Sequence, residues 1–401
     1  MEPHGSPLEE SETGVSRQDS SSPSRLAEKH DTKTAAIIRA CNRQDLESLR
    51  SLATSEGGLV SDDLRRRAWP LLLGPTEDPR DDWRELPKHR DEDQVELDVN
   101  RSFIFYPNDQ SAKDLAKRKK ELSELITEVL RRQPFLCYFQ GYHDICQVFL
   151  LVLEPLRRAP VVARLSTLRI RDFMLPTLTP ALAQLRLIPS ILYAVSPKLY
   201  HHLSQTQPFF ALSGTLTMYA HDIQEYGDIA RLFDVFLARE AAFSVYMFAQ
   251  IVLQRSDELF ETPADEPEML HSILSKLPQP LDLEALIKNT VGLIENHPPE
   301  SLKPWSLISK YSVLKTTRRP GLIVEQTLEF GEQDFRQQVK ELERAERQEK
   351  LLQQLWKYRR PARTIGFAVA VAVLSFWIRR SQVTTGIFEA LWHQLSQYKK
   401  A

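Results

Sequence analysis

A run of polar residues stands directly before an apolar stretch in the middle of the chain. In the segment YFQGYHDICQVFLLVL, from Tyr138 to Leu153, five consecutive residues from Gln140 to Asp144 are polar or conformationally permissive. A neutral carboxamide donates and accepts hydrogen bonds at once, and a histidine beside an aspartate could move protons or bind a metal. The segment therefore raises three options: a metal site, an acid–base pair, or residues that act by positioning alone.

Two histidine–aspartate pairs, His143-Asp144 and His221-Asp222, make a metal site one option. All-helical metal phosphohydrolases use a histidine, a His-Asp pair and a later aspartate around one or two metal ions. Here His89, His143, Asp144 and Asp222 could supply that set. Short pairs are weak signals, however, because histidine is also a common capping or core residue. Metal hydrolysis is therefore a minor alternative, and no metal ligand set is expected.

The cysteine content gives little support to a catalytic thiol or a disulfide framework. Cys41, Cys137 and Cys146 are odd in number and form no C-x-x-C pair, which suits a reducing compartment. The last two lie within apolar sequence, where a thiol usually behaves as a small hydrophobic residue. The chain also lacks a G-x-x-x-x-G-K-[ST] loop, so we do not expect it to bind a nucleotide as a P-loop enzyme.

The composition favours a folded helical protein. Glycine makes up 13 of 401 residues, about 3% against an average near 7%, and a scarcity of glycine favours helices over turn-rich β structure. Hydrophobic residues make up 42% of the chain, enough for a sizeable core, and the length leaves room for two or three domains. The net charge of −2 gives no reason to expect nucleic acid as a partner.

The apolar patterns predict an all-α fold with order beginning near Thr34. Residues 1–33 are rich in serine, glutamate and proline and lack an apolar signal-peptide core, so they predict a disordered tail. Helices are expected from Thr34, after Ser61, and from Lys113 to Arg132, where the apolar stripe is clear. The apolar run from Ile145 to Leu156 predicts a buried central helix, since it is too short to span a membrane. Further helices are predicted at 163–175, 181–194, 208–220, 228–238, 241–254, 266–275 and 281–296.

The character of the sequence changes after residue 303. Residues 304–360 are interpreted as a linker that contains a highly charged helix at 331–357. This helix has few apolar positions, which is more typical of a solvated spacer than of a strong coiled coil.

The C-terminal part, residues 361–401, is interpreted as a membrane anchor with a short tail. Residues 364–378 are 15 residues without a charge; as a helix they would measure roughly 22 Å, less than the hydrocarbon core of about 30 Å. A buried core helix is the alternative. Flanking arginines can snorkel and aromatic rings favour the interface, which offsets the deficit. These flanking residues are Trp356, Tyr358, Arg359, Arg360, Arg363, Trp377, Arg379 and Arg380. Because the segment lies near the C-terminus, we expect everything before it on one side, the cytosol.

Three separated motifs carry more information than any histidine pair. The first is Arg65-x-x-x-Trp69, within RRRAWPLLLG. The second, in VELDVNRSF, contains Asp98 and Arg101 at a spacing of three, and the third is Tyr138-x-Gln140. Taken singly, the first could be a stacked helix-surface pair and the second an ion pair one turn apart.

In this order and at this spacing, the three motifs resemble the signature of the TBC domain, the GTPase-activating module for Rab proteins. The resemblance extends from about Gly57 to Leu253 and includes RLFDVFLARE at 231–240. It implies a two-lobed helical TBC domain at 34–255 with a helical extension at 256–303. YFQGYHDI and LRIRDFMLPTL are similar to an endoplasmic-reticulum branch of the family, from which SGTLTMYAHD departs because tryptophans are usual there.

The resemblance implies a mechanism in which an arginine and a glutamine are supplied to the GTPase in trans. Carried over by position, Arg101 is the arginine finger that would lie against the γ-phosphate, and Gln140 would hold the attacking water. Asp98 would orient the arginine, Tyr138 would pack beneath the loop, and Gly141 would allow two backbones to approach closely. Arg65 and Trp69 are expected to hold the fold together rather than touch GTP.

These implications define a Rab GTPase activator that is not itself a GTPase and needs no cofactor of its own, since GTP and Mg²⁺ belong to the partner. The branch points to the endoplasmic-reticulum membrane, with the Golgi as a second possibility, and to a Rab of early secretory traffic. The alternative is a TBC-fold scaffold that binds a GTP-loaded Rab without catalysis. The presence of both Arg101 and Gln140 argues against the scaffold.

Overall fold

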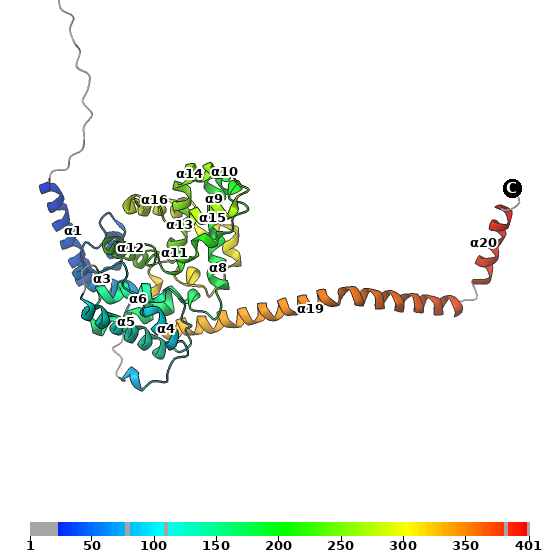
Figure 1. Cartoon of the computed structure of the whole chain (residues 1–401), viewed down its shortest axis with the longest axis horizontal. Helices are drawn as coiled ribbons and strands as arrows, with labels where there is room; N and C mark the ends of the chain where they lie inside the picture. Colours follow the sequence, from blue (N-terminus) through cyan, green and yellow to red (C-terminus); the bar gives the residue numbers. More distant parts are fainter. Residues whose placement is uncertain (1–22, 77–80, 108–110, 381–383, 399–401) are drawn as a thin grey trace, which may run out of the picture. The chain divides into compact units, whose positions relative to one another are not determined.

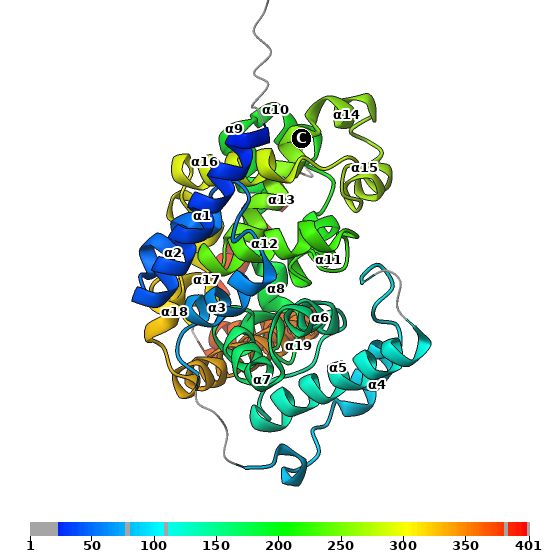
Figure 2. The same cartoon turned by 90° about the vertical axis from the view of Figure 1, so that its left-hand side faces the viewer.

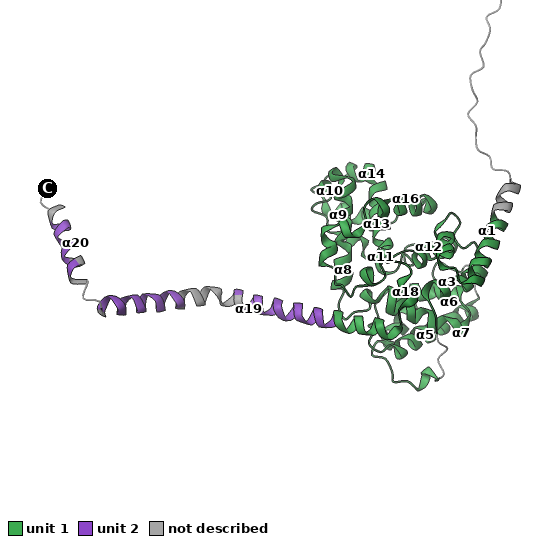
Figure 3. Ribbon diagram, turned by 180° about the vertical axis from the view of Figure 1, so that it is seen from behind, with its two compact units in different colours: residues 1–338 green, residues 339–401 purple. Residues whose placement is uncertain are grey.

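The computed structural model describes residues 23–76, 81–107, 111–380 and 384–398. Over these ranges the ordered elements are helices, and no β-strand occurs among them. The predicted all-α class is therefore confirmed for the described chain. Two compact units are present, residues 1–338 and residues 339–401 (Figure 3).

The first unit holds all helices up to the beginning of α19. Its α-helices are α1 (Pro23–Arg43), α2 (Leu46–Thr54), α3 (Asp62–Leu73), α4 (Glu92–Val99), α5 (Ala112–Arg132), α6 (Tyr142–Val152), α7 (Pro155–Arg164), α8 (Thr179–Leu185), α9 (Leu187–Val195), α10 (Pro197–His202), α11 (Leu212–Leu216), α12 (Tyr226–Ala238), α13 (Phe243–Gln254), α14 (Ser256–Glu261), α15 (Pro267–Leu274), α16 (Leu283–Asn296), α17 (Val313–Thr316) and α18 (Leu322–Glu325). Shorter 3-10 or π segments are η1 (Trp83–Glu85), η2 (Leu165–Arg169), η3 (Arg171–Phe173), η4 (Pro208–Ala211), η5 (Pro299–Ser301) and η6 (Lys303–Leu307).

Within the first unit the helices form two groups (Figures 1 and 2). In one group α5 packs against α4, α6 and α7, and in the other α13 packs against α9 and α16. Helix α12 lies between them and contacts α2 and α3. This arrangement brings the loop after α4, the start of α6 and the end of α11 to one place.

The helix at 112–132 shows why the periodic predictions succeeded. Leu122, Leu125, Ile126, Val129 and Leu130 recur at helical spacing and are all buried, which favours one packed face. Ser111 caps the first turn, since its hydroxyl accepts the Asp114 N–H at 3.2 Å. Local pattern and tertiary packing therefore favour the same structure here.

The central helix begins earlier than the apolar run predicts. It starts at Tyr142 rather than Ile145 and ends at Val152, so His143 and Asp144 lie in its first turn. The residue before it, Gly141, has φ 102°, which stops the preceding loop from continuing the helix backwards. The polar cluster is thus split between a loop that carries Gln140 and a helix that carries the histidine–aspartate pair.

At the N-terminus, the predicted disorder of residues 1–33 is wrong for the part that the structure describes. Helix α1 begins at Pro23, and residues 1–22 lie outside the described residues. Its C-terminal half is anchored by Ile37, which is fully buried. Extending a nucleated helix costs little, so a polar composition does not prevent it. The expected helix from Thr34 onward is interrupted, because Gln44 has a positive φ and Asp45 caps α2.

The segment predicted to be a linker after residue 303 is instead part of the first unit as far as Gln338. The side chain of Arg171 is fully buried and donates to Gln338 Oε1 at 3.1 Å and to Asp334 Oδ2 at 3.3 Å. Phe335 is also buried and packs edge-on against Phe135, with ring centroids 5.0 Å apart. The first turns of α19 (Leu328–Arg380) therefore pack against the helical domain.

The second unit comprises the rest of α19 and α20 (Thr384–Tyr398). The predicted charged helix and the apolar segment 364–378 are parts of this single helix α19. Within the described ranges, no helix combines the length and the apolar character needed to cross a membrane. The large apolar side chains whose exposure is described in 364–378 are all exposed. They are Phe367, Val369, Val371, Val373, Leu374, Phe376, Trp377 and Ile378.

Candidate functional site

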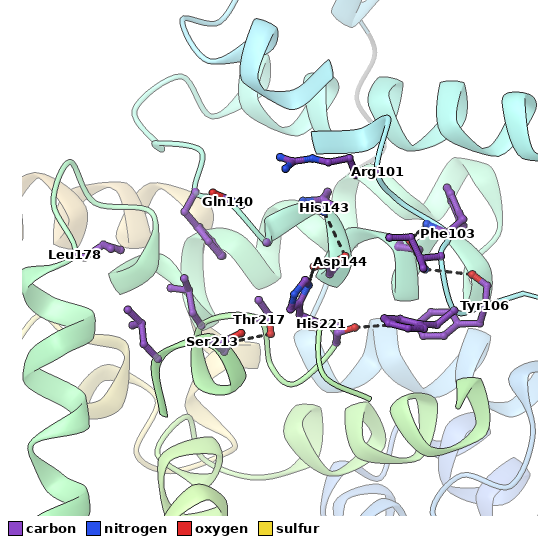
Figure 4. Close-up of a pocket in the computed structure, with 18 residues that line it drawn as sticks. Arg101, Phe103, Tyr106, Gln140, His143, Asp144, Leu178, Ser213, Thr217 and His221 are labelled. Carbon is purple, nitrogen blue, oxygen red and sulfur yellow. Dashed lines mark hydrogen bonds and ion pairs between the residues drawn. The ribbon is translucent and has the colours of Figure 1, made fainter. Parts of the chain in front are cut away.

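A cleft of about 520 Å³ opens where the two helix groups of the first unit meet (Figure 4). Its wall includes the loop after α4, the start of α6 and the end of α11 with the turn that follows. Arg101 and Gln140, 39 positions apart in the chain, both line it. The structure thus brings the two predicted finger residues to one cavity.

Arg101 stands at the end of a short helix beside a fully buried carboxylate. Its backbone N–H donates to Asp98 O at 3.0 Å, and its Nη2 pairs with Asp98 Oδ1. Asp98 is 0% exposed, whereas 62% of the Arg101 side chain is exposed. Gln94 also donates to Asp98 Oδ1, at 3.1 Å. The aspartate is therefore fixed in the interior and holds the arginine at the cleft.

Gln140 lies on an exposed turn whose shape depends on the next residue. Gly141 has φ 102°, a conformation that L side chains rarely adopt. A Cβ at this position would lie 2.6 Å from Cγ2 of Thr217, which comes from the other side of the cleft. Both the backbone angle and the close approach therefore require glycine beside Gln140.

Tyr138 links the two finger segments. Its hydroxyl donates to Asp98 Oδ2 at 2.9 Å, and its ring packs edge-on against Tyr142 at 6.0 Å. Burial and the nearby Asp98 carboxylate raise the pKa of Tyr138, so the phenol keeps its proton and remains a donor. Asp98 thus contacts Arg101 with one oxygen and the Gln140 segment, through Tyr138, with the other.

The loop that follows Arg101 is held by Gln147, a residue that the motifs in the sequence did not indicate. Phe103 has φ 62°, unusual for a bulky residue. Its N–H donates to the Oε1 of buried Gln147 at 2.9 Å, and Gln147 Nε2 donates to Tyr106 O at 3.3 Å. One carboxamide therefore fixes both ends of the strained loop. The position of Gln147, as a glutamine inside the otherwise apolar run ICQVFLLVL, is the feature of the sequence that could have indicated its role.

Arg65 and Trp69 are placed away from the cleft, in the interior. Asp234 of α12 is fully buried and accepts from Arg65 Nε at 3.0 Å, from Trp69 Nε1 at 2.8 Å and from Leu59 N at 2.9 Å. The Trp69 ring is fully buried and packs edge-on against Phe149 at 5.3 Å. These contacts join α3, α6 and α12, in agreement with a structural role for the first motif.

The residues of the alternative metal hypothesis are not brought together as one set. Asp91 N donates to His89 Nδ1 at 3.2 Å, and His89 Nε2 lies 3.0 Å from the backbone oxygen of Leu136. Among the residues that the structure describes, no three His, Cys, Asp or Glu side chains are grouped in a way that could hold a metal ion. His143, Asp144 and His221 do meet, but as a polar chain in the cleft: His143 Nε2 lies 3.3 Å from Asp144 Oδ1, and Asp144 Oδ2 is hydrogen-bonded to His221.

The surroundings of Cys137 and Cys146 disfavour the thiolate form that a nucleophilic cysteine needs. Burial raises the pKa of Cys137 and of Cys146, and a reactive cysteine needs a lowered pKa to form the thiolate. Cys146 is fully buried within α6. A catalytic thiol is therefore not supported at either position.

With this geometry in place, comparison with known proteins defines the class. The Rab-GTPase-TBC domain model matches residues 62–260. The chain belongs to this family, and the matched range contains Arg101 and Gln140, which line the cleft.

Among individual relatives, TBC1 domain family member 20 of Mus musculus is 34% identical over 319 residues, which cover 74% of this chain and 79% of the relative. The Homo sapiens protein of the same name is 35% identical, covering 68% and 70%. GTPase-activating protein gyp10 of Schizosaccharomyces pombe is 36% identical, covering 69% and 76%.

Proposed function

We propose that this protein accelerates GTP hydrolysis by a Rab GTPase by inserting Arg101 and Gln140 into the partner's nucleotide site. The observation that carries the proposal is the shared cleft. Both side chains are exposed and line one cavity, and the buried carboxylate of Asp98 contacts both finger segments. Such preorganisation lowers the cost of placing catalytic groups in a transition state.

The two residue types suit the chemistry of phosphoryl transfer to water. Negative charge on the transferring phosphoryl oxygens is stabilised by a cation, and an arginine finger is worth about 10³–10⁵ in rate. Arginine keeps its charge and presents a planar fork of donors that lysine cannot reproduce. The carboxamide of Gln140 can accept from a water and donate to it, which fixes the water for attack. GTP and Mg²⁺ are carried by the partner in this scheme.

We infer further that the protein works at a membrane of the early secretory pathway, the endoplasmic reticulum first and the Golgi second, with the TBC domain in the cytosol. The two TBC1 domain family member 20 relatives support this branch. The exposed apolar side chains within 364–378 support membrane association through that segment. Attachment to the same surface as a lipidated GTPase would raise their effective concentration.

Flotation of the full-length chain with vesicles of endoplasmic-reticulum lipid composition tests the membrane part. Wild type is expected to float with the vesicles. Val373→Glu, which places a charge in the middle of the exposed apolar segment, is expected to stay at the bottom of the gradient. Equal flotation of both proteins would exclude 364–378 as the attachment site.

The catalytic part is tested by single-turnover GTP hydrolysis with a panel of GTP-loaded Rabs and the full-length chain. Acceleration of one or two Rabs is expected, and Arg101→Ala and Gln140→Ala should each abolish it. Matched controls are Arg347→Ala, which removes an exposed arginine paired with Glu343, and Gln353→Ala, in the same exposed part of α19. Both controls should keep full activity.

Three other outcomes of the same assay are informative. A Rab that binds in its GTP form without acceleration would replace catalysis with the scaffold function. Acceleration of endosomal Rabs alone would contradict the early secretory assignment. Full activity in both finger variants would show that the cleft is not the catalytic site.

A further inference from the structure

The histidine–aspartate pair that the finger mechanism leaves unused forms part of a continuous polar chain. His143 is buried, with Nδ1 3.2 Å from the Tyr138 hydroxyl and Nε2 3.3 Å from Asp144 Oδ1. The other oxygen of Asp144 lies 3.0 Å from Nδ1 of His221. Figure 4 shows His143, Asp144 and His221 in succession within the cleft that Arg101 and Gln140 also line.

This chain ends at the residue that holds the arginine finger. The Tyr138 hydroxyl contacts Asp98 Oδ2, and the other oxygen of Asp98 pairs with Arg101. At its opposite end His221 is at the cleft surface, with 62% of its side chain exposed. The polar chain therefore runs from an exposed group on one wall, through a buried histidine, to the arginine finger.

The position of the single proton on the neutral His143 ring decides which way the Tyr138 hydroxyl points. Burial lowers the pKa of His143, an effect that Asp144 and Asp98 oppose, so the ring is neutral near pH 7 and has a single N–H. With the proton on Nδ1, the ring donates to the Tyr138 oxygen and the phenol donates to Asp98. With the proton on Nε2, that N–H lies near the Asp144 carboxylate, 3.3 Å away, and Nδ1 becomes an acceptor that competes with Asp98 for the Tyr138 proton.

We propose that His143 is a positioning residue for GTP hydrolysis. Its ring directs the Tyr138 hydroxyl, and this hydroxyl sets how Asp98 holds Arg101 relative to the Gln140 turn. Asp144, together with His221, fixes the orientation of the His143 ring. This inference rests on the proposed activation of a Rab GTPase. His143 does not touch the nucleotide in this scheme. Its effect passes through Tyr138 and Asp98.

Two substitutions at the same position separate the two nitrogens of the ring. The carboxamide of asparagine reaches about as far as Nδ1, and that of glutamine about as far as Nε2. His143→Asn therefore keeps a polar group for Tyr138, and His143→Gln keeps one for Asp144. We expect His143→Gln to lower the single-turnover rate at saturating full-length protein about 10-fold, and His143→Asn to keep it within about 3-fold of wild type.

The positioning role is distinguished from a structural one by three readouts. The affinity for the GTP-loaded Rab, and the Tm of the protein, should stay near wild type in both variants. Tyr138→Phe combined with His143→Gln should be no slower than Tyr138→Phe alone, because both changes break the same link. His201→Ala, which removes an exposed histidine on α10, is the matched control and should change nothing.

The outcomes separate this inference from the function on which it rests. If wild type accelerates no Rab, the proposed function fails and the positioning role fails with it. If wild type is active and Arg101→Ala is not, but both His143 variants keep the full rate, the positioning role alone is wrong. The same holds if the loss appears in affinity or Tm, or if the double variant loses the product of the two single losses.

A second measurement needs no GTPase. In the full-length protein with ¹⁵N-labelled histidine, the side-chain nitrogen shifts of His143 report which nitrogen carries the proton. Tyr138→Phe and Asp144→Asn should shift that proton in opposite directions. Unchanged His143 shifts in both variants would show that the polar chain does not control the ring, and would overturn the proposal independently of any activity.

Discussion

Two arginine–aspartate pairs in this protein contain the same residue types but differ in the exposure of the arginine. Asp234 and Asp98 are both 0% exposed, and each pairs with an arginine. The side chain of Arg65 is 9% exposed, and its guanidinium donates to Asp234 and to Asp62. Arg101 is 62% exposed and pairs with Asp98 through Nη2. One arginine is engaged inside the protein, whereas the other is held at its base and presented at a cleft.

The difference lies in where the remaining donors point. Around Asp234 of α12 the further partners are the indole N–H of Trp69 in α3 and the backbone N–H of Leu59 in the loop before α3. Around Asp98 the partners are Gln94 and Tyr138, which leave the arginine's fork available to an outside anion. The two buried carboxylates thus differ in whether the paired arginine is buried with them or exposed at a cleft.

The largest expected effect separates the two pairs by activity. Arg101→Lys keeps the positive charge but loses the planar fork, so we expect the stimulated hydrolysis rate to fall by about 10³ or more. Its chemical unfolding midpoint should match wild type, because the side chain is exposed. A destabilised Arg101→Lys protein would mean that the exposed pair also serves the fold.

The converse substitution tests the interior pair by stability. Arg65→Ala leaves Asp234 buried without its cation, and we expect the free energy of unfolding to fall by about 3–5 kcal/mol. Urea unfolding followed by circular dichroism measures this. The control Arg336→Ala breaks an exposed pair with Glu332 and should cost less than about 1 kcal/mol. A loss as small as the control's would remove the distinction between the two arginines.

The turn at Gly141, beside Gln140, can be tested by one substitution that strains it and a second that relieves part of the strain. Gly141→Ala should cost about 2–3 kcal/mol of unfolding free energy, from the positive φ and from the contact with Thr217 Cγ2. Thr217→Ser removes that methyl group and keeps the hydroxyl, which donates to Ser213 O at 2.9 Å. Adding it should recover the steric part and leave the backbone part. If Thr217→Ser recovers nothing, the close approach is not what requires glycine.

The smallest expected effect concerns Asp222, beside the exposed end of the polar chain. Burial raises its pKa to about 6 from the ordinary 3.8. The folded state therefore binds the proton more tightly than the unfolded state. Stability from this group is complete below pH 4 and is lost as the pH rises through 6. Relative to Asp222→Asn, wild type should lose on the order of 1–2 kcal/mol of unfolding free energy between pH 4.5 and 7. Urea unfolding of both proteins across this range measures it, and parallel curves would contradict the raised pKa.

The sequence singled out the two residues that we propose as fingers, but their connections to the rest of the site could not be predicted from it. Arg101 and Gln140 follow from motif spacing, and the structure places both at one cleft. The bond from Tyr138 to Asp98 joins residues forty positions apart, and no local pattern specifies it. The same is true of His221 and Asp144, which come from different helix groups.

The difference between the predicted linker after residue 303 and the structure has a physical cause. Residues 304–338 contain few regularly spaced apolar positions, so periodicity indicates a linker there. Their attachment uses irregularly spaced contacts, both polar and apolar: Gln338 donates to Asp172 Oδ1 at 2.8 Å, and the buried Phe335 ring packs against Phe135. Irregular packing of this kind leaves little trace in a hydrophobicity pattern, whereas the apolar stripe of α5 was predicted correctly.

The docking of the first turns of α19 has a practical consequence for the limits of the functional fragment. Arg171 is fully buried and loses two partners, Asp334 and Gln338, if the chain is cut before them. A recombinant fragment that stops at residue 260, where the family match ends, would leave the Arg171 guanidinium without these partners. It would also expose the Phe135 ring against which Phe335 packs. Limited proteolysis should therefore yield a resistant core that ends beyond Gln338. The smallest fragment expected to fold on its own therefore extends past the end of the family match at residue 260, to at least Gln338.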